Sequence, residues 1–289
     1  MIKNILKMVK RVEIGTIKLV ENLISGNYRS VFKGRGIEFS EVREYVLGDD
    51  IRAIDWNVTA RFNTPFVKEF VEERNLNVYL VFDVSSSNEF GYQKSKKEVG
   101  LEVAASIMFA ALRNNDDIGL CLFTDHIERF IPPKKGKKHV LRILRELIYH
   151  EPKSKKTDIS KSLTTLNKII KKRSIVFIIS DYLSESFERP LKLLKNKNDI
   201  ILININDIRE EELPDIGYML IEDKETGEQL VINTSDKNFR EFYTKQARKQ
   251  QELLNNIMKK LKIDIIRIRT DEPFYLPLKK FFLMRKKRR

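Results

Sequence analysis

Short, mostly apolar runs alternate with longer amphipathic stretches along most of the chain beyond residue 75. The apolar runs predict buried strands over residues 76–83, 117–124, 174–180, 200–206 and 263–269, and a short return strand, 127–131, that Pro132-Pro133 closes. Apolar residues at roughly every fourth position predict helices over 92–113, 137–149, 158–171, 187–196 and 236–261. Because strands and helices alternate in this way, we expect an α/β fold with a doubly wound, mostly parallel sheet.

The region before residue 76 follows a different pattern. Residues 2–24 predict an amphipathic, basic N-terminal helix that packs on the protein, with peripheral membrane contact as the alternative. Residues 27–75 are dense in alternating charge around Trp56, the only tryptophan. We expect a cap held to the following domain by paired charges, with Trp56 buried, and a docking surface as the alternative. The charged residues are Arg43, Asp49, Asp50, Arg52, Asp55 and Arg61.

The last part of the chain contains two further patterns. Short apolar stretches at 217–222 and 229–232 flank Thr226-Gly227 and predict a hairpin. The end of the chain is the basic run from Arg285 to Arg289, which we expect to be solvated and frayed. The pattern thus divides the chain into an N-terminal segment, 1–75, an α/β domain, 76–270, and a basic tail, 271–289.

Polar residues directly follow the first buried strand. Asp83, Ser85 and Ser87 are two positions apart, so in an extended turn all three can point the same way. In open α/β sheets, ligands bind at the carboxyl ends of the strands. Oxygen ligands with few carboxylates suit Mg²⁺, which retains several of its waters. This motif is weak alone, and it requires partners elsewhere in the chain.

Two candidate partners occur later in the sequence. Thr157 stands in a loop at the start of a predicted helix, and Asp181 lies just past the end of the predicted strand 174–180. The five residues, in this order, resemble the metal-ion-dependent adhesion site of von Willebrand factor A domains. That resemblance implies that Ser85, Ser87 and Thr157 contact a Mg²⁺ or Mn²⁺ ion, while Asp83 and Asp181 act largely through bound water.

A second resemblance covers roughly residues 30–185. The segments Gly34–Tyr45, Gly48–Trp56, Thr59–Arg61, Val67–Phe70 and Phe130–Gly136 are similar to the signature of the DUF58 family of bacterial proteins. Members place this charged segment before a von Willebrand factor A domain and are commonly encoded beside MoxR-type AAA+ ATPases. The resemblance implies a von Willebrand factor A-like fold and a MoxR-type ATPase as partner, acting with a client protein that the sequence does not name.

Charge and cysteine content narrow the choice of compartment and partner. The formal net charge is +14, but without a nucleic-acid-binding motif we treat nucleic acid as an unlikely partner, kept as an alternative. The single cysteine, Cys121, lies in an apolar run and predicts a buried, inert thiol. Lysines interrupt every apolar stretch near the N-terminus, so we expect no signal peptide and a cytoplasmic location.

Catalytic motifs are weaker than the binding motif. A haloacid-dehalogenase-type phosphatase also begins from an aspartate after a buried strand, but Ser85 stands where its second aspartate would be. The three histidines show no metal-ligand spacing, and we expect them at surface or turn positions. A phosphate-binding P-loop sequence is absent. The sequence therefore favours a Mg²⁺-dependent protein-interaction module without catalytic activity, with a Mg²⁺-dependent phosphatase as the alternative.

Overall fold

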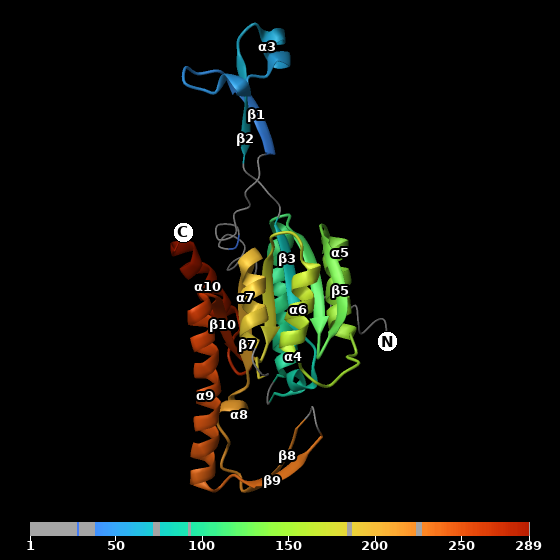
Figure 1. The fold of residues 1–289 in the computed structure, drawn as a ribbon, viewed down its shortest axis with the longest axis vertical. Coiled ribbons are helices and arrows are strands. Elements are labelled where there is room, and N and C mark those ends of the chain that lie inside the picture. Colours follow the sequence, from blue (N-terminus) through green and yellow to red (C-terminus); the bar gives the residue numbers. More distant parts are fainter. Residues whose placement is uncertain are drawn as a thin grey trace.

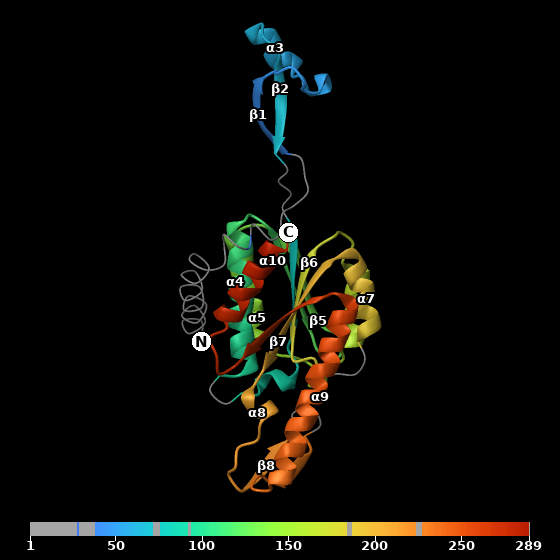
Figure 2. The same cartoon turned by 90° about the vertical axis from the view of Figure 1, so that its left-hand side faces the viewer.

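The computed structural model describes residue 28 and residues 38–71, 76–91, 94–183, 187–223 and 227–288. Figures 1 and 2 show a sheet flanked by helices, with a slender arm at one end and a hairpin at the other. The helix predicted for residues 2–24 lies outside the described residues. Among those described, no helix combines the length and apolar character that crossing a membrane requires.

A six-stranded sheet forms the centre of the molecule. Its strand order is β10-β7-β6-β3-β4-β5, and only β5 runs antiparallel to its neighbour. The predicted α/β class with a mostly parallel sheet is thereby confirmed. The strands are β3 (Asn77–Asp83), β4 (Asp117–Phe123), β5 (Ile127–Lys134), β6 (Ile175–Ser180), β7 (Asp199–Asn206) and β10 (Asp264–Arg269).

Helices cover both faces of this sheet. One apolar cluster joins it to α4 (Lys96–Arg113), α5 (Lys137–Tyr149) and α10 (Tyr275–Lys287). A second cluster joins the opposite face to α6 (Ile159–Ile169), α7 (Glu188–Lys197) and α9 (Lys237–Leu261). The sheet and these six helices are called the sheet body below.

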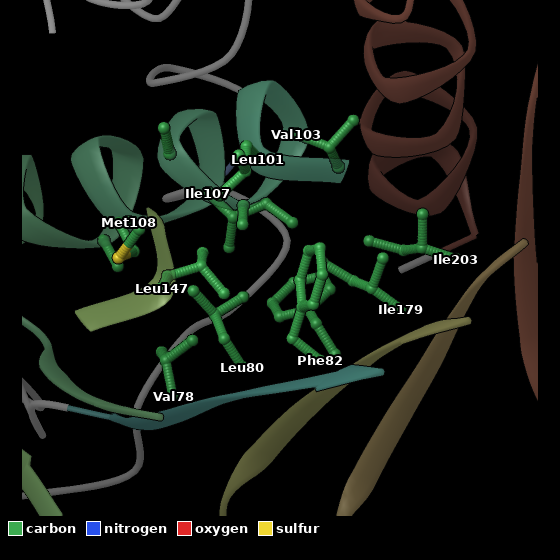
Figure 3. Close-up of a cluster of buried hydrophobic side chains, with 14 of the residues drawn as sticks. Val78, Leu80, Phe82, Leu101, Val103, Ile107, Met108, Leu147, Ile179 and Ile203 are labelled. Atoms are coloured by element: carbon green, nitrogen blue, oxygen red, sulfur yellow. The ribbon is translucent and has the colours of Figure 1, made fainter. Parts of the chain in front are cut away.

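Alternation along each strand explains the two clusters. In β3, Leu80 and Phe82 point to the α4 face, where Figure 3 shows them beneath Ile107 and Leu147, whereas Tyr79 and Val81 belong to the opposite cluster. Burial of both faces accounts for the continuously apolar strands in the sequence. The helix α4 can lie close to the sheet because Gly100 has no side chain. A Cβ at this position would stand only 2.8 Å from the Phe82 ring.

Two element boundaries differ from the predictions. Strand β5 continues through Pro132-Pro133 to Lys134, instead of ending before the prolines. It is an edge strand, and prolines are tolerated there because no neighbour requires their missing N–H groups. Helix α4 begins at Lys96, not at residue 92, because Ser95 and Glu98 form a capping box.

Residues 38–71 form the arm. Strands β1 (Glu38–Glu44) and β2 (Phe66–Val71) pair antiparallel, and a 3₁₀ turn, η2 (Ile51–Ala53), and helix α3 (Trp56–Phe62) connect them. Figures 1 and 2 show the arm projecting from the end of the sheet at which β3 begins. The prediction that Trp56 is buried is wrong, since its side chain is 66% exposed.

Charged side chains organise the arm locally. Arg43 and Asp49 form an ion pair at 2.7 Å, and Lys68 lies 3.4 Å from Asp55. Asp55 also caps α3 by accepting hydrogen bonds from two backbone N–H groups, and Asp50 caps η2 in the same way. Among the six residues predicted to pair with one another, Arg43 and Asp49 form an ion pair inside the arm, whereas Asp50 and Asp55 cap turns. This pairing does not hold Trp56 against the sheet body.

The C-terminal part of the chain is more ordered than expected. After β7 come a short helix, α8 (Ile208–Glu211), and the predicted hairpin of β8 (Tyr218–Glu222) and β9 (Gln229–Asn233). The expected frayed tail is instead helix α10, in which Leu278, Phe281 and Phe282 are buried against the sheet. Arg285 of α10 also pairs with Asp199 and Asp264.

Candidate metal centre

The carboxyl ends of β3 and β6 lie side by side in the middle of the sheet. The chain leaves β3 toward β4, and β6 pairs with the other side of β3. The order of strands therefore reverses between β3 and β6, and such a switch point leaves a crevice in which α/β proteins bind ligands. Asp83 ends β3, and Ser180-Asp181 ends β6.

Asp83 lies at the centre of this crevice and is fully buried. One carboxylate oxygen, Oδ1, accepts hydrogen bonds from the Ser85 hydroxyl at 2.7 Å and the Ser85 backbone N–H at 3.0 Å. The other oxygen, Oδ2, accepts one from the Ser180 hydroxyl at 2.7 Å. Hydroxyls from both strand ends therefore converge on one carboxylate, which fixes its orientation.

The turn after β3 brings the second serine into the same place. Ser85 directly precedes the short 3₁₀ turn η3 (Ser86–Glu89), and its hydroxyl oxygen lies 3.1 Å from that of Ser87. Asn88 donates its side-chain N–H to the Asp83 carbonyl at 3.1 Å and so ties the turn back to the strand. The predicted convergence of Asp83, Ser85 and Ser87 is present in the structure.

Asp181 has a partner that the sequence did not suggest. The ammonium of Lys96, with a side chain that is 0% exposed, lies 2.8 Å from Asp181 Oδ2 and 2.6 Å from Glu210 Oε1. Lys96 opens α4, one turn before the close approach of Gly100 to Phe82, which positions it over the end of the sheet. Asp181 is thus held by a buried cation that also reaches α8.

Burial dominates the electrostatics of the site. Burial and, to a smaller extent, the nearby charge of Asp181 raise the pKa of Asp83 to about 6, against the opposing influence of the Ser85 and Ser180 hydrogen bonds. For Lys96, burial lowers the pKa, but Asp181 and Glu210 outweigh it and leave the pKa raised. Burial also raises the pKa of Glu210, against the opposing influence of Lys96. A second cation in the crevice would favour ionised Asp83.

Thr157 approaches the site on the loop that precedes α6. The backbone N–H of Ser86 donates to the Lys155 carbonyl at 3.4 Å, which places this loop beside the serine turn. Glu128 of β5 holds the same loop by accepting hydrogen bonds from the N–H groups of Lys153 and Ser154 at 3.0 and 3.2 Å. Thr157 itself is half-buried, two residues from the contact with the serine turn.

The donor set determines which ions this crevice could hold. The described residues contain no cluster of three or more His, Cys, Asp or Glu side chains suited to a metal, so any ion would depend on hydroxyl oxygens. Two serine hydroxyls beside one carboxylate form such a set, which suits a hard divalent cation that keeps part of its water shell. The residues therefore fit Mg²⁺ or Mn²⁺, with Lys96 already neutralising part of the negative charge.

The sequence analysis did not predict several residues that lie at the site. Ser180 was expected only as the residue before Asp181, yet it bonds directly to Asp83. The position of Lys96 could have indicated its burial. It stands three and seven residues before Val99 and Val103, on the apolar stripe of α4. Glu128 and Glu210 carried no sequence signal for their contacts at the site, since Lys153, Ser154 and Lys96 are distant from them in the sequence.

The other candidate groups lie outside the crevice or are inert. Cys121 is buried as predicted, and burial raises its pKa to about 12. His139 has its Nε2 atom 2.9 Å from the Ile118 carbonyl. His150, expected at a surface or turn position, directly follows the end of α5; its side chain is 12% exposed and lies 3.7 Å from Glu128.

Comparison with known proteins agrees with the sequence resemblance. The family described as "Protein of unknown function DUF58" matches residues 41–253. The chain is 28% identical over 223 residues to the uncharacterized protein Rv1480 of Mycobacterium tuberculosis, which spans 76% of this chain and 70% of that protein.

A solved structure shares the fold. The conserved hypothetical protein BatB from Bacteroides thetaiotaomicron superimposes with a TM-score of 0.50 at 13% identity, covering 74% of this chain and all of that one. The von Willebrand factor A domain of SpRpn10 gives a TM-score of 0.42 at 12% identity, covering 71% of this chain and 94% of that one.

Proposed function

The chain belongs to the DUF58 family, and from that premise we propose that it is a protein-interaction module that binds its partner through a Mg²⁺ ion and catalyses no reaction. The observation that carries the proposal is the buried Asp83 carboxylate, on which the hydroxyls of Ser85 and Ser180 converge at 2.7 Å. This arrangement lies at the switch point of the sheet, where α/β folds bind ligands.

In this proposal, Asp83, Ser85, Ser87, Thr157 and Asp181 hold Mg²⁺ or Mn²⁺. A divalent ion at such a site supplies an open coordination position that a carboxylate of another protein can fill. The protein's own residues supply the orientation: Ser180 and the Ser85 N–H fix Asp83, and Lys96 fixes Asp181. Because these supports are buried, the site is rigid before any partner arrives.

The surroundings of Asp83 support binding over catalysis. A phosphatase that used Asp83 as nucleophile would require a second acid two residues later, where Ser85 instead donates its hydroxyl proton to Asp83. The nearest cation, Lys96, is held between Asp181 and Glu210. Metal-assisted hydrolysis requires a base that activates water, and every acid described at the crevice is already hydrogen-bonded or ion-paired.

The partner in this proposal is a MoxR-type AAA+ ATPase, with a client protein whose carboxylate meets the metal, in the cytoplasm. The support is that members of this family are commonly encoded beside such ATPases. This chain also lacks a P-loop sequence. An ATPase partner would supply the nucleotide chemistry that this chain does not contain.

Calorimetric titration of Mg²⁺ and Mn²⁺ tests the metal site directly. We expect saturable binding to the intact protein and its loss in Asp83→Ala and Ser87→Ala, with the fold retained in circular dichroism. Ser86→Ala is the matched control, because this neighbouring serine lies outside the predicted set. Equal affinity in all of these proteins would contradict the assignment.

Capture experiments test the partner separately. The purified protein, immobilised, should retain a MoxR-type ATPase from the same organism with Mg²⁺, and lose it with chelator or in Ser85→Ala. Capture that is independent of metal would remove the metal-bridged mechanism while leaving the ATPase as partner. Metal-dependent phosphatase turnover that disappears in Asp83→Ala would contradict the non-catalytic assignment.

A further inference from the structure

The two outer strands of the sheet differ in how their free edges are protected. Strand β5, at one edge, carries Pro132-Pro133, which cannot donate hydrogen bonds to a further strand. Strand β10, at the other edge, contains no proline, and no described strand pairs with its outer side. Exposed edges of this kind are templates for an added strand.

The backbone of β10 leaves hydrogen-bonding groups on this open side. Its parallel register with β7 is continuous, and the Thr270 N–H just beyond it donates to Asn206 of β7. Since backbone groups of successive residues point to opposite sides of a strand, Asp264, Ile266 and Ile268 face β7. The N–H and C=O groups of Ile265, Arg267 and Arg269 therefore point outward.

This edge lies in a groove between two helices. Helix α9 packs on one face of the sheet and α10 on the other, and β10 runs between them (Figure 1). The groove has a volume of about 470 Å³. Its apolar lining includes Met258, Ile263 and Phe281, which are already buried in the core, and Met284 of α10, whose side chain is 45% exposed and open to a docked strand.

The charge of the groove is strongly positive. Five cations line it: Lys259, Lys262, Arg267, Arg285 and Arg288. The single carboxylate in the lining, Asp264, already pairs with Arg285 and Arg288. Lys259, Lys262 and Arg267 form no ion pair with a described residue, and Arg267 instead donates to the Asn255 side-chain oxygen.

We propose that the β10 edge is a docking site for an extended acidic segment of a partner protein, which adds as a seventh strand of the sheet. Carboxylates at alternate positions of that segment would meet Lys259, Lys262 and Arg267 on the α9 side. Apolar residues between them would meet the exposed Met284 on the α10 side. Backbone bonds give affinity in this mode of recognition, and alternate side chains give specificity.

The same observations disfavour a second copy of this chain as occupant. Antiparallel pairing of two β10 edges would bring two sets of five cations together, and these like charges would repel one another. A polyanion such as nucleic acid would match the charge, but it would leave the outward N–H and C=O groups of the edge and the apolar lining unused. The charge and the backbone together therefore favour an acidic strand.

A synthetic ten-residue peptide that alternates glutamate and valine, labelled with a fluorophore, is the probe. We expect saturable binding in fluorescence anisotropy below about 1 mM peptide, and slower hydrogen exchange at the amides of Ile265, Arg267 and Arg269. Two peptides of the same charge serve as controls: one has its glutamates in a single block, and the other has N-methylated backbone nitrogens. Both should bind much more weakly.

Matched protein variants locate the site. Lys259→Glu with Lys262→Glu should weaken the alternating peptide by about tenfold or more, since each change reverses a charge at the edge. Lys245→Glu with Lys249→Glu makes the same net change on exposed positions of the same helix and should alter the affinity much less. Equal weakening by the two pairs would contradict the proposal.

Three other results would overturn it. Equal binding of the blocked or N-methylated peptide would show that the groove attracts anions without pairing a strand. Absence of binding by the alternating peptide would show that the lysines and arginines serve only to prevent other strands from pairing with the edge. Self-association in sedimentation that the groove variants abolish would assign the edge to a second copy. The metal site plays no part in this test, so its outcome is independent of the function proposed above.

Discussion

The arm and the sheet body are stabilised in different ways, although both are rich in apolar and aromatic residues. In the sheet body, strands contribute side chains to two continuous clusters, and residues such as Leu80 and Phe177 are fully buried. In the arm, Leu47 is 97% exposed, and Val46, Ile51, Trp56 and Phe62 are all exposed by more than half. The arm therefore displays apolar surface of the kind that the body buries.

Hydrogen bonds and ion pairs of short sequence separation explain how the arm keeps its shape. Asp50 and Asp55 cap their own turns, Arg43 pairs with Asp49 six residues away, and Thr59 accepts a hydrogen bond from the Phe66 N–H. Caps and exposed ion pairs each contribute little. Exposed apolar residues on such a scaffold are typical of an interaction surface. In the arm, a high density of charged residues therefore accompanies locally ordered turns, and these residues are not buried.

The largest effect should come from removing a ring in the body. Phe177→Ala should lower the free energy of unfolding by about 3–5 kcal/mol, because it leaves a cavity among side chains that cannot close it. Phe62→Ala in the arm removes the same atoms from an exposed site and should change it by about 0.5 kcal/mol or less. Urea denaturation of both variants measures the difference. Similar losses would show that the arm shares the body's core.

A buried charge pair in the body should come next. Lys96→Met removes the cation between Asp181 and Glu210 and should cost about 3 kcal/mol, because the buried Asp181 and the partly buried Glu210 lose their partner. The control is Lys94→Met, which breaks a pair with Glu102 at 2.8 Å whose lysine is half exposed. Adding Glu210→Gln to Lys96→Met should restore part of the loss. Equal costs at positions 94 and 96 would contradict the burial of this pair.

Asp116 is a buried carboxyl beside Leu76, directly before β3, and it makes the stability of the body depend on pH. It accepts a hydrogen bond from the Leu76 N–H at 2.9 Å, and burial raises its pKa to about 6. Since the folded pKa exceeds the unfolded value of about 4, its contribution to stability is fully present below pH 4 and is lost as pH rises through 6.

Asp116→Asn should therefore reduce the fall in stability between about pH 4 and pH 6, by about 2 kcal/mol. Urea midpoints measured across this range provide the test. Asp83, whose pKa is also raised to about 6, gives a slope of the same sign, so part of the fall should persist. The exposed Glu252→Gln is the control, and an unchanged slope in Asp116→Asn would contradict the buried environment of this carboxyl.

The sequence was sufficient for most of the body because the central strands β3, β4, β6 and β7 are apolar on both faces and the predicted helices have apolar stripes. It also predicted that Asp83, Ser85 and Ser87, which lie within five residues of one another, come together, and that Asp181 lies just past a strand. That these residues hold a metal stays a prediction. Lys96 was missed because its partners stand 85 and 114 residues away. Such pairs form only when the fold brings distant segments together.

Two other misses have equally specific causes. The stripe of Leu278, Phe281 and Phe282 has helical spacing, but the basic run that follows it led to the expectation of a frayed tail. In the arm, the dense charge around Trp56 was interpreted as a buried ion network. Sequence composition did not distinguish that case from charged residues that cap turns and pair on the surface, because both use the same residue types.

The smallest effect is expected at Trp56, and it gives the sharpest test of the comparison. Trp56→Ala should change the free energy of unfolding by about 0.5 kcal/mol or less, because the indole is 66% exposed. As the only tryptophan, it also makes intrinsic fluorescence a probe of the arm alone. Its emission in the native protein should resemble that of indole in water and be quenched readily by iodide.

Denaturation followed by two probes then separates the regions. Tryptophan emission reports on the arm, and far-ultraviolet circular dichroism reports mainly on the helices of the body. If the arm is stabilised only by its local contacts, the two transitions should not coincide, since coincidence is the mark of a single cooperative unit. Coincident curves, together with a loss of several kcal/mol in Trp56→Ala, would show that the arm packs against the body in solution. In that event the charged segment would be a structural cap instead of an exposed surface for partners.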